Sequence, residues 1–131
     1  MEHDFFEPQN VVADAYFYRF ILHDWSDEDS KRILSAAVAG LPKGSRLIIM
    51  DMVTPEPGTG PWFMEKYIRT LDVAMYALLA GKERSLEEFK SLVTAVAPGL
   101  RFESCSCPPG SALSMMTWRN EDGCATCVSG M

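Results

Sequence analysis

The sequence predicts an α/β fold with about four strands and three helices, in which the first two strands are parallel and the last two form an antiparallel pair. The first observation is an apolar run at 15–22, an amphipathic stretch at 27–41 and a second apolar run at 46–53, joined by short connections. Strand, helix and strand in this order form a βαβ unit with parallel strands and a right-handed crossover. The second observation is a pair of apolar runs at 100–107 and 112–118, whose connection is short enough for antiparallel neighbours.

The βαβ unit is supported residue by residue. Residues 15–22 are rich in aromatic and branched side chains, and 46–53 is a nearly continuous apolar run of the kind that is buried on both faces. Ser26 is expected to cap the helix at 27–41, because acids fill the first turn, where the helix dipole favours negative charge. The apolar side chains of this helix form one stripe: Ile33, Leu34, Ala37, Val38 and Leu41.

Two more helices are predicted beyond a loop at 55–61 that is rich in proline and glycine. Residues 62–79 read as a helix, and its density of methionine and aromatic residues is usual for core side chains. Ser85 opens a third helix, with Glu88 three residues on as a capping box. The stripe of the third helix consists of Phe89, Leu92, Val93 and Val96.

Composition limits the class of protein. The chain has 131 residues, 47% hydrophobic and 23% charged, which is enough for one domain with a core. The net charge of −6 argues against nucleic acid or an anionic membrane as a partner. There is no apolar run of about 20 residues and the acidic amino terminus is no signal peptide, so we expect a cytoplasmic protein.

The four cysteines are Cys105, Cys107, Cys124 and Cys127. Their Cys-x-Cys and Cys-x-x-Cys spacing is compatible with a zinc site or a redox pair. Cys105 and Cys107 alternate along a predicted strand and should face the same side of the sheet. Free thiols are the expected state in a cytoplasmic protein, and no metal site is predicted.

His23 and Asp24 follow the first predicted strand and precede the first helix. In an open α/β sheet, ligands bind at this carboxyl edge. His23 can be a general base, since an imidazole has a near-neutral pKa, or a histidine that packs at the end of a strand. The residue type leaves both interpretations open.

Residues 22–28, Leu-His-Asp-Trp-Ser-Asp-Glu, resemble the catalytic segment of the S-adenosylmethionine-dependent O-methyltransferases of plant and fungal secondary metabolism. Five further stretches resemble that family in the same order: 3–6, 46–51, 72–75, 81–85 and 109–114. The resemblance identifies residues 1–119 as the carboxy-terminal half of a Rossmann-like catalytic domain, and residues 120–131 are expected to be a flexible tail.

The resemblance assigns three catalytic residues. His23 would remove the proton from a substrate hydroxyl, oriented by Asp51 and Glu83. Asp51 stands where the family usually has a glutamate, so its shorter side chain could hold the imidazole loosely or through water. The alternatives are an acid at a strand end that caps the next loop for Asp51, and a solvated acid for Glu83.

The resemblance also implies that S-adenosylmethionine is the methyl donor and that a small phenolic or polyketide-type metabolite is the acceptor. Four residues match the cofactor-contacting positions: Asp4, Phe5, Arg19 and Trp25. Three match the substrate side: Asp24, Met75 and Leu79. The alternative is a purely structural role, in which Phe5 and Phe6 cover the core and Trp25 packs in it.

One expected motif is missing. Methyltransferases of this type need a glycine-rich turn against the cofactor, and no Gly-x-Gly-x-Gly occurs in the sequence. We therefore expect weak or no binding of S-adenosylmethionine by this chain alone. Two other functions stay open: a protein that no longer methylates and uses His23 for acid–base chemistry such as cyclisation or dehydration, and a non-catalytic partner subunit.

The strand at 15–22 should be an exposed edge with Arg19 as its only charge. Natural edge strands are normally protected by prolines, bulges or several charges. We therefore expect the chain to associate with itself or with a methyltransferase-like chain.

Overall fold

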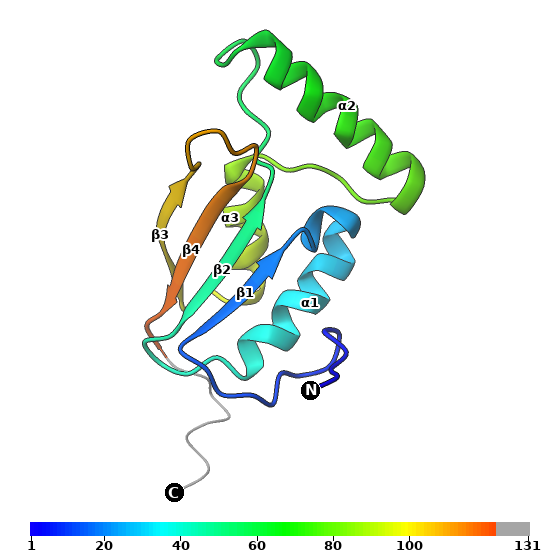
Figure 1. Ribbon diagram of the computed structural model, residues 1–131. Coiled ribbons are helices and arrows are strands. Elements are labelled where there is room, and N and C mark those ends of the chain that lie inside the picture. Colours follow the sequence, from blue (N-terminus) through cyan, green and yellow to red (C-terminus); the bar gives the residue numbers. More distant parts are fainter. Residues whose placement is uncertain (123–131) are drawn as a thin grey trace, which may run out of the picture.

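A four-stranded mixed sheet with helices packed against one face forms the body of the computed structural model, which describes residues 1–122 (Figure 1). The order of the strands in the sheet is β1-β2-β4-β3. β1 and β2 are parallel, whereas β4 is antiparallel to both of its neighbours. This confirms the predicted parallel first pair and antiparallel last pair, although the insertion of β4 between β2 and β3 was not predicted. The strands are β1 (Ala15–Arg19), β2 (Arg46–Asp51), β3 (Leu100–Ser106) and β4 (Ser114–Asn120).

Three α-helices and one 3₁₀ turn complete the fold: η1 (Leu22–Asp24), α1 (Asp27–Ala39), α2 (Trp62–Leu79) and α3 (Leu86–Val96). Both predicted caps are present. The hydroxyl of Ser26 accepts from the backbone of Asp29 at 3.2 Å, and Ser85 and Glu88 form a complete capping box. Within residues 1–122 no helix combines the length and the apolar character that crossing a membrane requires.

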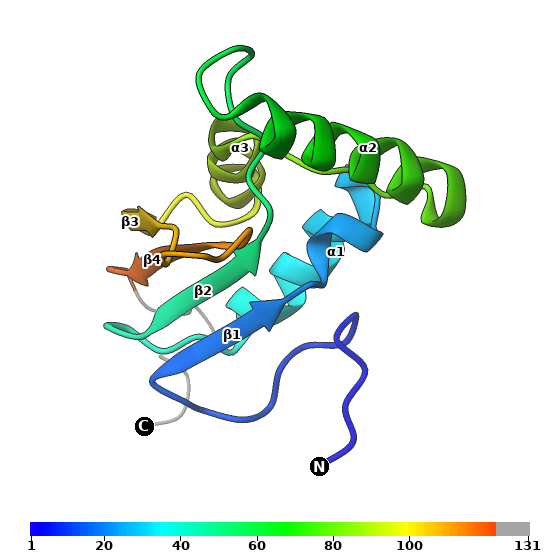
Figure 2. The same ribbon diagram turned by 45° about the horizontal axis from the view of Figure 1, so that its top comes forward.

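The core lies between the sheet and the two helices α1 and α3, which cover the same face (Figure 2). Trp118 of β4 is buried in it and meets the ring of Phe102 of β3 edge-on, at 5.4 Å between centroids. Most of the predicted helix stripes point into this core. Its buried members from the helices are Ile33, Leu34, Ala37, Phe89, Leu92 and Val93.

β1 is shorter than the predicted strand at 15–22. It ends at Arg19 because Phe20 takes a left-handed conformation, with φ of 55°, which leaves the ladder of a sheet. The chain then turns into η1, so His23 lies in a 3₁₀ turn just past the strand. β2 also ends early, at Asp51, and beyond it Val53 makes an isolated parallel bridge to Arg84.

α2 has the bounds that the sequence predicts, but its predicted place in the core is wrong. The helix lies across the end of the sheet and stands away from the body (Figure 2). Of its 18 residues only Ile68 is buried, against Met52 and Leu113. The large side chains that are exposed are Trp62, Phe63, Tyr67, Val73, Tyr76, Leu78 and Leu79.

The carboxyl end of the described chain is tied to the body. β4 runs two residues beyond the predicted strand, and the side-chain amide of Asn120 donates to the carbonyl of Leu41 at 2.8 Å. Ordered structure therefore enters the range 120–131, and residues 123–131, with Cys124 and Cys127, lie outside the described residues. Cys105 and Cys107 are exposed free thiols.

Candidate active site

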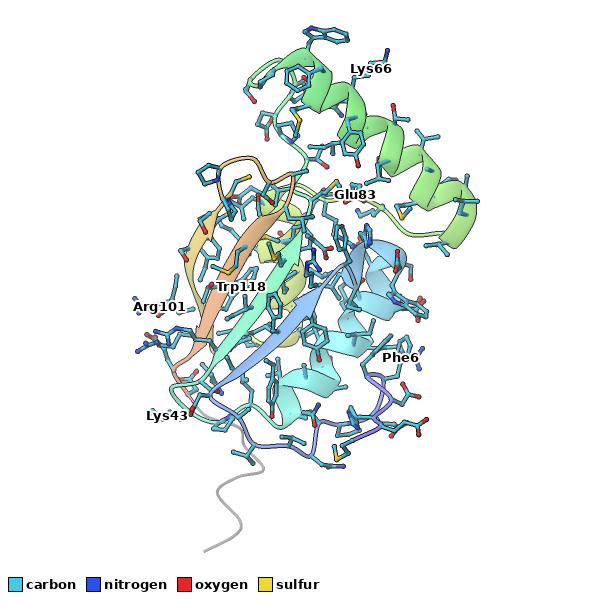
Figure 3. All side chains as sticks on the ribbon, viewed as in Figure 1. Phe6, Lys43, Lys66, Glu83, Arg101 and Trp118 are labelled. Carbon is cyan, nitrogen blue, oxygen red and sulfur yellow. The ribbon has the colours of Figure 1, made fainter. Side chains whose placement is uncertain are left out.

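The three predicted catalytic residues meet at one end of the sheet. His23 lies in η1, Asp51 is the last residue of β2, and Glu83 lies in the segment between α2 and α3. β1 and β2 are parallel, so their carboxyl ends reach the same edge, where open α/β sheets bind ligands. Figure 3 shows Glu83 between this edge and α2. All three side chains come from residues that are buried.

His23 is held by Glu83. Its Nδ1 lies 2.9 Å from Oε1 of Glu83, whose side chain is fully buried. A carboxylate can only accept, so Nδ1 carries the proton and Nε2 is left to accept one when the ring is neutral. Nε2 lies 3.2 Å from Oδ1 of Asp24. The hydrogen bond to Glu83 raises the pKa of His23; burial opposes this, and the charges of Asp51, Glu83 and Asp24 add to the rise.

Asp51 acts on His23 through charge and not through a hydrogen bond. It is 1% exposed, and neither carboxylate oxygen has a hydrogen-bond partner within residues 1–122. Burial is the main reason why the pKa of Asp51 rises to about 7, and the neighbouring positive charges of His23 and Arg84 moderate the rise. Of the two acids expected to orient His23, therefore, only Glu83 bonds to the ring.

The segment 81–84 lies directly against η1. The backbone of Lys82 donates to the carbonyl of His23 at 3.1 Å. A Cβ atom at position 81 would collide with that same carbonyl oxygen, so Gly81 is required by close approach of two backbones. Arg84 donates to carbonyl oxygens on both sides of His23. Sequence reasoning had singled out this stretch for Glu83 and missed the roles of Gly81 and Arg84.

Asp72 links α2 to the same segment. Its Oδ1 accepts from the backbone N–H of Glu83 at 2.8 Å. The 72–75 stretch was noticed in the sequence, but a bond from a helix to a loop 11 residues later has no periodic signal. The position of α2 is thus coupled to the acid that holds His23.

The residues expected to contact the cofactor divide into two groups. Phe5 meets the ring of Trp25 edge-on at 5.9 Å, and Phe6 does so at 5.0 Å. Asp4 shapes this turn, since its side chain accepts from the backbone of Phe6 at 2.9 Å. Arg19 lies apart from the cluster; its guanidinium carbon is 5.3 Å from the ring centroid of Phe20. The aromatic rings of Phe5, Phe6 and Trp25 also pack against the core, as the alternative interpretation expected.

The residues expected on the substrate side lie around η1 and α2, which are in contact. Asp24 is beside Nε2 of His23, as described above. Met75 is half-buried, and its carbonyl accepts from the backbone of Gly81 at 3.3 Å. Leu79, one turn further on, is 51% exposed.

Comparisons with known proteins identify the family of this chain. The family model of the O-methyltransferase domain matches residues 1–97. The chain belongs to this family. It is similar to the O-methyltransferase FrzF of Cladobotryum sp, with 47% identity over 116 residues, 88% of this chain and 27% of the relative. It is 50% identical over 117 residues to the 6-hydroxytryprostatin B O-methyltransferase of Aspergillus fumigatus, covering 89% of this chain and 34% of the relative.

Solved structures show the same fold. The structure of TnmH superposes with a TM-score of 0.81 and 28% identity, over 92% of this chain and 34% of TnmH. A structure described as a pericyclic reaction enzyme gives 0.79 and 28% identity, over 92% of this chain and 30% of that protein. This member of the O-methyltransferase family thus has part of a Rossmann-like fold and spans about a third of the length of the relatives that it matches.

Proposed function

We propose that this chain supplies the acid–base part of a site that transfers a methyl group from S-adenosylmethionine to a hydroxyl of a small aromatic or polyketide-type metabolite. The observation that carries the proposal is the hydrogen bond of 2.9 Å between buried Glu83 and Nδ1 of His23. It directs the unprotonated nitrogen, Nε2, away from the acid that orients the ring. The family membership supplies the class of reaction.

In this proposal Nε2 of His23 accepts the proton of the substrate hydroxyl. The oxygen is left with the electron pair that would bond to the methyl carbon of the donor, and the bond from that carbon to the sulfonium sulfur would break, leaving a neutral thioether. Glu83 holds the ring and stabilises the imidazolium that forms. Asp51 adds negative charge behind it whenever its carboxyl is ionised. Asp24, Met75 and Leu79 would place the hydroxyl near Nε2, which is a contribution of position and orientation.

The aromatic turn beside η1 fits part of the cofactor. Phe5 and Trp25 offer apolar ring surface for an adenine, and Asp4 fixes the turn that carries Phe5. S-adenosylmethionine, when bound, supplies an electrophilic methyl group. Arg19 is exposed and would contact it from a different side.

A chimera tests the proposal. The stretch of 117 matched residues of this chain would replace its counterpart in the Aspergillus fumigatus relative, and methylation of 6-hydroxytryprostatin B would be measured. We expect the chimera to methylate, and the same chimera with His23→Gln to be slower by about 10²–10⁴-fold. Lys43→Gln is the matched control, since Lys43 is exposed at the opposite end of the sheet from Glu83 (Figure 3). Full turnover with His23→Gln would show that another group is the base.

A second candidate is acid–base chemistry without methyl transfer, such as a cyclisation or dehydration at His23. It is favoured by the similarity to the structure described as a pericyclic reaction enzyme. Mass spectrometry separates the two. Methylation adds the mass of one CH₂ group to the substrate, cyclisation by isomerisation leaves the mass unchanged, and dehydration removes one water.

A further inference from the structure

We propose that Arg84 is a positioning residue, which holds the backbone on both sides of His23 and thereby keeps the imidazole against Glu83. The inference rests on the proposed role of His23 as the base. Two neighbouring residues bind different parts of the same turn. Glu83 binds the side chain of His23, and Arg84 binds the backbone of η1.

The guanidinium group of Arg84 brackets His23. Nη1 donates to the carbonyl of Leu22 at 2.8 Å, and Nη2 donates to the carbonyl of Trp25 at 2.9 Å. Leu22 precedes His23 directly and Trp25 follows it by two residues, so the short turn is fixed at both ends. The bond from the backbone of Lys82 to the carbonyl of His23 fixes its middle.

Arg84 is itself firmly placed. Its side chain is fully buried, with Nε donating to Asp27 at 2.9 Å and Nη2 to the hydroxyl of Ser30 at 3.2 Å. A buried charge is costly unless it is paired and hydrogen-bonded, and here every nitrogen of the fork has an acceptor. Its backbone is anchored too, because its carbonyl accepts from Thr54 at 2.9 Å, beyond the end of β2.

The geometry requires the fork of an arginine. Two carbonyls on opposite sides of a turn and a carboxylate at the start of α1 are reached at once by a planar group with five donors. A lysine at this position keeps the charge, but its single nitrogen cannot span these acceptors. Arg84→Lys therefore removes the paired hydrogen bonds to the carbonyls of Leu22 and Trp25, while the positive charge of the side chain is kept.

NMR titration of the imidazole protons tests the proposal in the full chain without any need for methylation. The chain has two histidines, so a His3→Gln background leaves the signal of His23 alone. The groups that face the ring are Asp24, Asp51 and Glu83, and they hold its pKa above 6.5. We expect Arg84→Lys to lower the pKa of His23 toward 6.5, in the same direction as Glu83→Gln, because a displaced ring loses its bond to Glu83.

Arg46→Lys is the matched control, since Arg46 pairs with Glu103 on the sheet and should leave the pKa of His23 in place. A folded Arg84→Lys chain in which the pKa of His23 equals that of the native chain would overturn the proposal. Should Arg84→Lys fail to fold, Asp27→Ala removes the acceptor of Nε and leaves the carbonyls of Leu22 and Trp25 untouched. It should lower the pKa of His23 by less, and an unchanged value would equally overturn the proposal.

Enzyme kinetics of the chimera distinguish a failure of the Arg84 proposal from a failure of the proposed function. In the chimera, Arg84→Lys should lower kcat with little change in KM, because a positioning residue acts on the base and not on substrate binding. Retained methylation with His23→Gln would refute the base, whereas the titration would still decide whether Arg84 positions the ring.

Discussion

Asp51 is a buried carboxylate with no hydrogen-bond donor among residues 1–122, and its environment sets how the site responds to pH. Burial raises its pKa from 3.8 to about 7, so the folded chain binds its proton more tightly than the unfolded chain does. Such a group stabilises the fold at low pH, and the stabilisation is lost as the pH rises toward the folded pKa. The raised pKa of His23 acts in the same direction, with its contribution present below 6.5 and lost above.

We therefore expect the free energy of unfolding to fall as the pH rises from 5 to 7, with Asp51 contributing about 1.4 kcal/mol per pH unit over most of this range. Asp51→Asn removes the ionisation and should flatten this dependence. Urea denaturation at a series of pH values measures both chains. Equal slopes for the native and Asp51→Asn chains would show that Asp51 ionises freely in the folded state.

Gly81 is the residue whose replacement should disturb His23 most directly without touching its ring. A Cβ at position 81 would meet backbone atoms of His23 and Asp24, which cannot move aside as a flexible side chain can. We expect Gly81→Ala to destabilise the chain by about 1–3 kcal/mol, as overpacking does. Gly60→Ala is the control because a Cβ there meets nothing within 4 Å. Thermal or urea unfolding distinguishes the two, and equal stability would mean that the segment relaxes away from η1.

At the scale of single residues, sequence reasoning could find His23, Asp51 and Glu83, because residue type and the order of the stretches carry that signal. It could not find that Asp51 lacks a donor or that Arg84 reaches Leu22, 62 positions earlier in the chain. These facts depend on which backbones approach each other, and spacing along the chain does not record them.

α2 is the element that sequence reasoning places correctly along the chain and incorrectly in space. Its apolar content predicts a helix, and the bounds are confirmed at Trp62 and Leu79. The same content suggested a core helix, yet its surface is largely exposed. Periodicity reports that a helix has an apolar side; it does not report whether a described part of the same chain covers that side.

Few contacts attach α2 to the rest of the fold, so we expect this helix to open independently of the core. Ile68 is its one buried residue, and Asp72 is its bond to Glu83. We expect Ile68→Ala to speed hydrogen exchange of the α2 amides while the amides of β2 and β4 keep their protection, since local opening need not unfold the core. Leu78→Ala is the control, because Leu78 is 75% exposed. Unchanged exchange in α2 would show that other contacts hold the helix.

At the scale of the whole molecule, the sheet has α1 and α3 on one face, and β1 has a strand neighbour on one side within residues 1–122. Phe17 of β1 is 56% exposed, and Arg19 is the only charged residue of the strand. Within residues 1–122, β1 is therefore an edge strand with an exposed aromatic side chain, as predicted. Unpaired backbone and apolar surface together favour association.

We expect the chain to form oligomers with itself or to pair with a methyltransferase-like chain, and Phe17→Lys to weaken this association by placing a charge on the edge. Light scattering across a concentration series measures the mass in solution. Val73→Lys is the control, since it adds the same charge on an exposed position of α2. A stable monomer at all concentrations for the native chain would contradict the expectation.

The bond between His23 and Glu83 closes a loop of 60 residues. Closing so long a loop is entropically costly until the intervening elements are in place. We therefore expect this hydrogen bond to form late in folding: a nascent or nicked chain that has formed only α1 and the β1–β2 pair would lack the largest cause of the raised pKa of His23. If His23 is the base, as proposed, it would gain its orienting acid only when the segment before α3 has docked, and a raised pKa of His23 would then mark the completed fold.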